Sequence, residues 1–254
     1  MDFWNKRSEN FKNNTGGEKG KKRVEKVMCW LEGQGVPMDG ISVLDIGAGP
    51  GTFALAFARR GCKVVALEPA GSMVAFLQAE IVQERLDNIT IVQKTWEGID
   101  PVKENWEGQF DLVFASMSPG INNRETLDKA LNCARKHCYI STFAGKREND
   151  VLMELWPILF GEEMPPWPGD IIYMLNYLYA QGYELTFRVW EESWAEETSE
   201  EEAAGNLLGM MRMYGKENHH LEGRIRTFVR EKSRKGQFNQ ETVTRLGQIL
   251  VSKT

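Results

Sequence analysis

The stretch VLDIGAGPGTF at residues 43–53 decides the fold of this chain. An apolar, β-branched run over 41–46 leads into a turn that contains three glycines, and a nearly continuous apolar run over 52–60 follows. This order predicts a buried strand, a tight turn and a buried helix. Glycine lets the backbone approach a ligand closely, and the first residues of a helix have free N–H groups. The turn is therefore typical of a nucleotide-type cradle.

Two details distinguish this turn from a dinucleotide-binding fingerprint. The glycines follow the spacing G-x-G-x-G and not G-x-G-x-x-G. In addition, Asp45 lies inside the strand, just before the first glycine. A carboxylate here would repel a pyrophosphate, whereas it suits a ligand that carries a positive charge near the turn. A NAD-dependent oxidoreductase is therefore disfavoured.

Strands and helices alternate outward from the turn. Further strands are predicted over 63–67, 89–93, 110–115 and 138–143, with helices over 21–32, 52–60, 71–85 and 125–135. This alternation predicts an α/β protein with a doubly wound, mostly parallel sheet that is covered by helices on both faces. Strand-like runs over 183–190 and 248–251 bring the expected sheet to seven strands.

Composition excludes several classes of protein. The 254 residues are 42% hydrophobic and 26% charged, which is typical of a globular protein and not of a disordered or fibrous one. The net charge of −5 makes nucleic-acid binding an improbable main task, because such binding depends on Lys and Arg. The four cysteines lack the spacing of a metal site, and no apolar run is long enough to span a membrane. We expect a cytoplasmic protein without a metal.

These motifs resemble the class I S-adenosylmethionine-dependent methyltransferases, and most closely the small-molecule type 11 group, over residues 41–145. The resemblance implies S-adenosylmethionine as the cofactor, with its methionine part wrapped by the turn. It also implies that an acid at the end of the second strand binds the ribose hydroxyls and that apolar atoms after it pack on the adenine. The residues that match these roles are Asp45, Gly47, Ala48, Gly49 and Gly51 in the turn, then Glu68, and then Pro69 and Met73.

The third strand departs from the family pattern. The family usually has an acid after this strand that binds the adenine amino group, but Thr95 occupies the corresponding position. Thr95, Trp96 and Glu97 therefore remain alternative adenine contacts. The fourth strand ends at Ser116 and Met117, where the family faces the transferred methyl group. The sequence there continues with Ser118 and lacks the N/D-P-P-Y/F motif, which argues against methylation of base amino groups.

The resemblance organises the whole chain as one domain over 1–254. We expect an N-terminal helical segment over 1–40, a cofactor-binding core over 41–145, an inserted helical cap over 146–181 and a C-terminal part over 182–254 that completes the sheet. The glutamate-rich run over 191–202 is interpreted as the solvated start of a helix. Within the first segment, Trp4 or Arg7 is a candidate to cover the carboxylate of the cofactor.

An acceptor pocket is expected above the ends of the fourth and fifth strands, under the cap. Its candidates are Tyr173, Tyr177, Trp156 and Ser118, with Trp167 and Tyr179 as further aromatic residues. Tyr173 and Tyr177 are four residues apart and share a helix face, so Tyr173 is the first choice. No catalytic base is assigned: His137 is interpreted as structural, and His219 and His220 as part of a solvated turn.

The predicted reaction is methyl transfer to a small-molecule acceptor by in-line displacement, with S-adenosylhomocysteine as the product. Two other functions stay open. One is a methyltransferase that acts on a protein or tRNA, and its only support is the basic clusters over 19–26 and 224–235. The other is a regulator that binds the cofactor without turnover. The acceptor and the oligomeric state do not follow from the sequence.

Overall fold

The computed structural model describes residues 17–165, 170–216 and 219–253. The strands are β1 (Ser42–Ile46), β2 (Lys63–Leu67), β3 (Ile89–Val92), β4 (Phe110–Ser116), β5 (Ala134–Asn149), β6 (Glu184–Ser199) and β7 (Gln237–Ser252). The helices are α2 (Glu18–Gly33), α3 (Thr52–Arg59), α4 (Gly71–Glu84), α5 (Arg124–Cys133), α6 (Asp150–Phe160), α7 (Ile171–Ala180), α8 (Glu200–Met213) and α9 (His219–Lys232). None of the helices in these ranges is long and apolar enough to cross a membrane.

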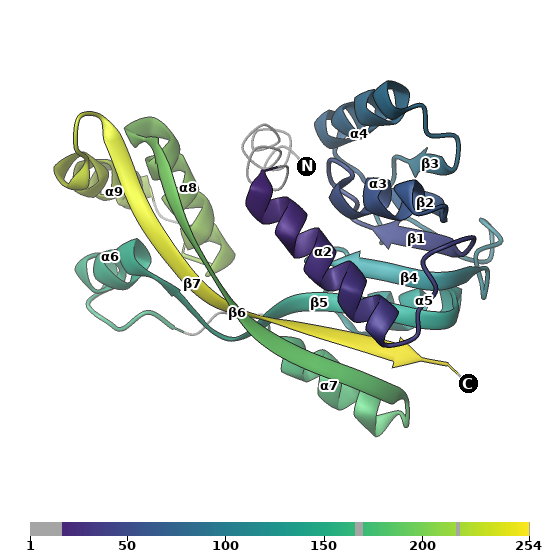
Figure 1. The fold of residues 1–254 in the computed structure, drawn as a ribbon. Coiled ribbons are helices and arrows are strands. Elements are labelled where there is room, and N and C mark those ends of the chain that lie inside the picture. Colours follow the sequence, from purple (N-terminus) through teal and green to yellow (C-terminus); the bar gives the residue numbers. More distant parts are fainter. Residues whose placement is uncertain (1–16, 166–169, 217–218, 254) are drawn as a thin grey trace. The chain divides into compact units, whose positions relative to one another are not determined.

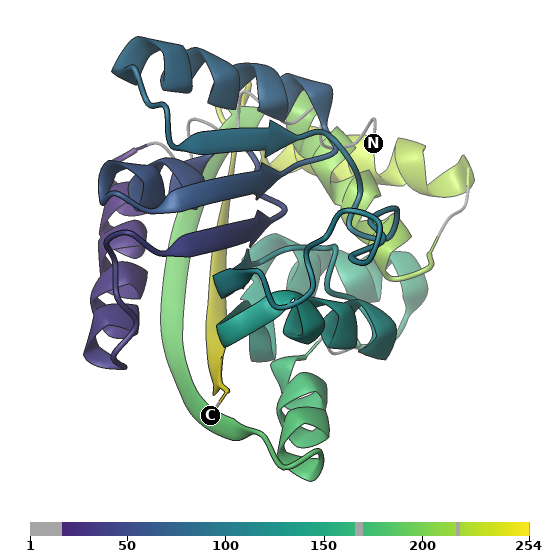
Figure 2. The ribbon, with the colours of Figure 1, turned by 90° about the vertical axis from the view of Figure 1, so that its right-hand side faces the viewer.

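The strands form one seven-stranded sheet in the order β3-β2-β1-β4-β5-β7-β6. β1 pairs in parallel with β2 and β4, and the outer pairs β2–β3 and β4–β5 are also parallel. Figure 2 shows β1, β2 and β3 side by side with their arrows in the same direction. The predicted fold class, a mostly parallel seven-stranded α/β sheet, is confirmed.

The contacts divide the chain into two compact units, where we predicted one domain. Unit 1 comprises residues 1–141, 176–187 and 248–254, and unit 2 comprises 142–175 and 188–247. Unit 2 therefore contains α8 and α9 in addition to most of the predicted cap over 146–181.

Unit 1 is built on the apolar faces of its strands and helices. In α3, every residue from Phe53 to Ala58 is buried, and its small alanines let the helix pack closely on the sheet. Phe114 of β4 packs between Phe57 of α3 and Tyr139 of β5. α2 lies beside α3 and contributes Val27 and other apolar side chains to the same core (Figure 1). This core holds the carboxyl ends of β1, β2 and β4 in fixed positions.

Unit 2 has its own apolar core between α6, α8 and α9. Trp156 of α6 is fully buried there and packs on Tyr214, with ring centroids 5.0 Å apart. Asn149 begins α6: its side chain accepts the Leu152 N–H at 2.8 Å and donates to the Thr242 hydroxyl at 2.8 Å. Asn149 is buried, and these bonds satisfy its amide group.

The last three strands are longer than the sequence suggested. β5 covers 134–149 instead of 138–143, and β7 covers 237–252 instead of a short run at 248–251. In β7 the buried positions include Gln240, Thr242 and Thr244, so polar residues hide its alternating pattern. The interpretation of 191–202 as a helix start was wrong for most of the run, because β6 continues to Ser199 and α8 begins only at Glu200.

Candidate functional site

The glycine turn connects the carboxyl end of β1 to α3. The N–H groups of Gly47 and Ala48 donate to the carbonyl oxygen of Leu67 at 2.8 and 3.0 Å, so the turn is fixed to the end of β2. Gly47 has a φ of +76° and Gly51 a φ of +93°, which L side chains rarely adopt. A Cβ on Gly47 would lie 2.5 Å from the Ser118 hydroxyl oxygen. The turn and the loop after β4 thus approach closely.

Glu68, at the end of β2, lies against this turn. Its carboxylate accepts the Gly49 N–H at 2.9 Å through Oε2 and the Ala70 N–H at 2.8 Å through Oε1. Burial raises the pKa of Glu68, and the two N–H donors partly oppose this shift. The structure thus brings together the turn and the acid that the sequence singled out for the ribose.

Asp45 is a second buried carboxyl group beside the turn. Its side chain is 3% exposed, and Oδ2 has no hydrogen-bond partner among the described residues. Burial, together with the negative charge of Glu68, raises the pKa of Asp45 to about 8, while the Ala54 N–H opposes the shift. An unsatisfied buried acceptor costs free energy. A ligand that offers a donor or a positive charge would relieve this cost, so the residues fit the predicted cofactor.

Hydroxyl groups line the carboxyl end of β4. The Ser116 and Ser141 hydroxyl oxygens are 3.1 Å apart, and the Met117 N–H donates to the Ser141 carbonyl oxygen at 2.8 Å. Met117 itself has a φ of +54°. The Ser118 hydroxyl accepts the Gly120 N–H at 3.3 Å. β4 pairs with β1, so Ser116 ends its strand next to the glycine turn.

Arg23 also reaches this strand end, and sequence reasoning missed it. Arg23 is a half-buried residue of α2, and its Nη2 donates to the Ser116 hydroxyl at 3.3 Å. A signal was present, because Arg23 is four residues before Val27 and so shares the apolar face of the helix. A charged residue in an apolar stripe requires a partner.

The three adenine candidates occupy different environments. Trp96 is 2% exposed, its Nε1 donates to the Thr126 carbonyl oxygen at 3.0 Å, and the Lys129 ammonium lies 4.5 Å from its ring centroid. This packing leaves little of the Trp96 ring for stacking on adenine. The Thr95 hydroxyl accepts the Gly98 N–H at 3.2 Å, and the exposed Glu97 accepts from the Asn122 amide at 3.3 Å. The assignment of the adenine contact stays a prediction.

The candidates for the acceptor pocket are divided between the two units, and the pocket itself stays a prediction. Trp156, expected to line it, instead belongs to the apolar core of unit 2, because packing in that core buries it completely. The Tyr177 hydroxyl in unit 1 donates to Asp128 at 2.7 Å and accepts from Arg124 at 3.1 Å, both on α5. Tyr173 is 70% exposed in unit 2.

The remaining candidates are Tyr179, His137 and three residues outside the described ranges. Tyr179 is exposed, and Trp4, Arg7 and Trp167 lie outside the described residues. His137 lies in β5, opposite Leu112 of β4. Its Nδ1 is 3.4 Å from the Ser252 hydroxyl oxygen. Burial and the charge of Lys136 lower the pKa of His137. These contacts support its structural role.

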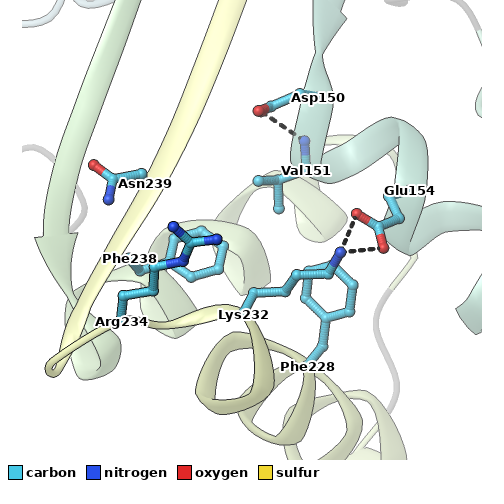
Figure 3. A pocket seen from close by; sticks show the side chains of 8 residues that line it. All are labelled: Asp150, Val151, Glu154, Phe228, Lys232, Arg234, Phe238 and Asn239. Atoms are coloured by element: carbon cyan, nitrogen blue, oxygen red, sulfur yellow. Dashed lines mark hydrogen bonds and ion pairs between the residues drawn. The ribbon is translucent and has the colours of Figure 1, made fainter.

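Two cavities lie elsewhere on the units and were not predicted. One, of about 540 Å³, lies along α5 in unit 1 and is lined by Pro101, Glu107, Arg124, Glu125, Asp128, Lys129 and Asn132. The other, of about 340 Å³, lies in unit 2 between α6, α9 and β7 (Figure 3). Figure 3 shows the Lys232 ammonium against both carboxylate oxygens of Glu154 at the rim of the second cavity.

Comparison with known proteins identifies the region around the turn. Residues 43–139 match the family model described as a methyltransferase domain, and this range contains the turn, Glu68 and Ser116. Residues 43–139 therefore have the sequence of a methyltransferase domain. The predicted enzyme class and its cofactor are confirmed at the level of this domain, whereas the individual cofactor-binding residues stay predictions.

Other relatives of the methyltransferase domain are more distant. A Mycobacteroides abscessus protein described as an uncharacterized methyltransferase is 48% identical over 40 residues, which is 16% of this chain and 15% of that protein. A magnesium protoporphyrin IX methyltransferase from Synechocystis PCC 6803, with bound S-adenosylhomocysteine, has a TM-score of 0.53 and 14% identity, over 92% of this chain and 83% of its own. A Galdieria sulphuraria protein assigned as a sarcosine dimethylglycine methyltransferase has a TM-score of 0.54 and 14% identity, over 91% of this chain and 85% of its own. The two structures show that the fold is shared.

Proposed function

We propose that this protein transfers a methyl group from S-adenosylmethionine to a small-molecule acceptor by in-line displacement and releases S-adenosylhomocysteine. The observation that carries the proposal is the Glu68 carboxylate, which accepts the Gly49 N–H at the carboxyl ends of β1 and β2. A carboxylate in this position is able to accept hydrogen bonds from two neighbouring ribose hydroxyls. The match of residues 43–139 to a methyltransferase domain supports the same role.

The chain's part in the reaction is to bind and to align. The sulfonium group of S-adenosylmethionine supplies a methyl group that is already activated. The first residues of α3 offer N–H groups, and the buried Asp45 complements a positively charged part of the ligand. Ser116 and Met117 end β4 beside the turn, where an acceptor would be held. Alignment of this kind is worth roughly 7–11 kcal/mol of the barrier.

A small acceptor is favoured over tRNA because part of the basic run over 224–235 forms ion pairs or hydrogen bonds within unit 2. Arg226 pairs with Glu201 and Glu222, and Lys232 pairs with Glu154. Arg224 donates to the main-chain carbonyl of Leu159 at 3.1 Å. The names of the two solved relatives, which refer to a porphyrin and to sarcosine, agree with a small acceptor.

The cellular location remains part of the proposal. All four cysteines are free, and three of them are buried. Reduced, buried thiols fit a cytoplasmic protein.

Calorimetric titration with S-adenosylmethionine, S-adenosylhomocysteine and NAD tests the proposed cofactor. We expect micromolar binding of the two adenosyl ligands and none of NAD. Glu68→Ala should weaken adenosyl binding by about tenfold to a hundredfold, because hydrogen bonds to a charged group contribute about 1.5–3 kcal/mol. Glu84→Ala is the matched control, since the Glu84 carboxylate pairs with Arg59 on the helix surface. A wild-type protein that binds neither adenosyl ligand would overturn the proposal.

Transfer of a labelled methyl group tests the acceptor class. A metabolite extract, a tRNA pool and a protein pool are offered separately, at low and high salt. Labelling confined to the metabolite extract, and insensitive to salt, supports a small acceptor, because tRNA binding weakens steeply with salt. Labelling of tRNA or protein alone would favour the macromolecular alternative, and adenosyl binding without any labelling would favour a regulator.

A further inference from the structure

Arg23 brings a positive charge into the interior of unit 1. It lies in the second turn of α2 and is half-buried. Its Nη2 donates to the Ser116 hydroxyl at 3.3 Å, whereas its Nε is shielded from solvent and has no acceptor among the described residues. The guanidinium therefore holds an unused, desolvated donor next to the end of β4.

This strand end lies at the place where α/β sheets bind their ligands. Along the order β3-β2-β1-β4-β5, the connections run outward in opposite directions from β1 and β4. The crevice at the carboxyl ends of two such strands is the usual ligand site. The glycine turn follows β1 and Ser116 ends β4, so Arg23 reaches the rim of that crevice.

No acid neutralises Arg23 within the described ranges. It forms no ion pair there, and its one hydrogen bond to a described side chain is to the neutral Ser116. The buried acids Asp45 and Glu68 are not partners either. Burial and main-chain N–H groups account for the pKa shifts of both, together with the charge of Glu68 in the case of Asp45. Partial burial of the guanidinium charge without a counter-ion costs free energy, which indicates that an anion completes the site.

We propose that Arg23 binds an anionic group, a carboxylate or a phosphate, on the acceptor and thereby selects anionic small molecules for methylation. This proposal rests on the proposed function and specifies its substrate class. The planar guanidinium matches both anions with two parallel hydrogen bonds. Ser116, whose hydroxyl is 3.1 Å from that of Ser141, positions the guanidinium from one side. The acceptor would then be anchored beside the strand end that faces the transferred methyl group.

The test is an anion titration of the protein loaded with S-adenosylhomocysteine. The probes are benzoate, its uncharged analogue benzamide, and inorganic phosphate. All are used at constant ionic strength, so that the screening of charges by salt does not vary. The variants are Arg23→Met, Arg23→Lys and Lys21→Met, the last of which removes an equal charge from an exposed position of the same helix. Thermal melting of each variant checks that it is folded.

We expect wild type and Lys21→Met to bind benzoate or phosphate about tenfold to a hundredfold more tightly than Arg23→Met. The anion affinity of Arg23→Lys should lie between these values, because lysine keeps the charge but cannot form the two parallel hydrogen bonds of a guanidinium. All variants should bind benzamide with the same affinity as wild type. Equal anion affinities of wild type and Arg23→Met would overturn the proposal.

The same titrations separate this proposal from its rivals. If Arg23→Met weakens the binding of S-adenosylhomocysteine and leaves anion binding unchanged, the guanidinium serves the carboxylate of the cofactor and the proposal is wrong. If all folded variants bind S-adenosylhomocysteine but none binds anions, the proposed function stands and the substrate class falls. If wild type binds no S-adenosylhomocysteine, the proposed function fails and this inference fails with it.

Discussion

Replacement of Gly47 by alanine tests the closest approach in the candidate site. The added Cβ would lie 2.5 Å from the Ser118 hydroxyl oxygen and 3.1 Å from the Ser118 Cβ. Gly47 also has a φ of +76°, so alanine would be strained even with space around it. The substitution therefore combines a backbone cost with a steric cost.

The two costs have different sizes. An L residue in the left-handed region costs about 1–2 kcal/mol. Relief of the clash requires Ser118 to move away from the Gly120 N–H, and the loss of this hydrogen bond costs about 0.5–1.5 kcal/mol. We expect Gly47→Ala to lower the free energy of unfolding by about 1.5–3.5 kcal/mol. The displaced turn should also weaken the binding of S-adenosylhomocysteine at least tenfold.

Gly40→Ala separates these contributions. Gly40 has a φ of +68°, and a Cβ there would meet no atom within 4 Å, so this variant carries the backbone cost alone. Urea unfolding gives both stabilities, and calorimetry gives the affinity for S-adenosylhomocysteine. Ser118→Ala alone should cost about 0.5–1.5 kcal/mol, and it should cost little more in the Gly47→Ala background, where the same hydrogen bond is already lost. Equal destabilisation by Gly47→Ala and Gly40→Ala, with adenosyl binding intact in both, would refute the close approach.

Two further predictions concern buried carboxyl groups whose pKa shifts have opposite directions. Burial raises the pKa of Asp45 to about 8, above the ~3.9 of an unfolded chain, so its contribution to stability is lost as the pH rises from about 4 to 8. Asp45→Asn should therefore exceed wild type in unfolding free energy by about 5 kcal/mol at pH 8 and by little at pH 4, because one pKa unit corresponds to about 1.4 kcal/mol. Parallel pH profiles of the two proteins in urea would contradict this. Burial alone would raise the pKa of Asp111, but hydrogen bonds from Arg135 and Ser42 hold it well below its usual range. The ionised Asp111 therefore stabilises the fold above about pH 4, and this stabilisation is lost in acid. Asp111→Asn should lower the free energy of unfolding by about 1–3 kcal/mol at pH 7. Between pH 4 and 2 the stability of this variant should depend less on pH than that of wild type. A variant that keeps the acid sensitivity of wild type would show that other carboxylates cause it.

The sequence by itself determined the glycine turn and the place of Glu68 beside it. A glycine turn between an apolar strand and an apolar helix has a local physical cause, because backbone conformation and side-chain period act over a few residues. The parallel register then places the ends of β1 and β2 together, so that Glu68 meets Gly49 as the spacing suggested. These features follow from neighbours in sequence and from one general rule of sheet topology.

Only the tertiary structure decided the contacts between distant segments. Arg23 and Ser116 are 93 residues apart, and their contact depends on how the apolar face of α2 packs in unit 1. Trp96 looked like a ligand contact, yet a carbonyl of α5 and the Lys129 ammonium engage it. Trp156 looked like a pocket residue, yet α8 and α9 bury it. An aromatic or charged side chain carries the same local signal in a core and in a site, and only its packing partners distinguish the two.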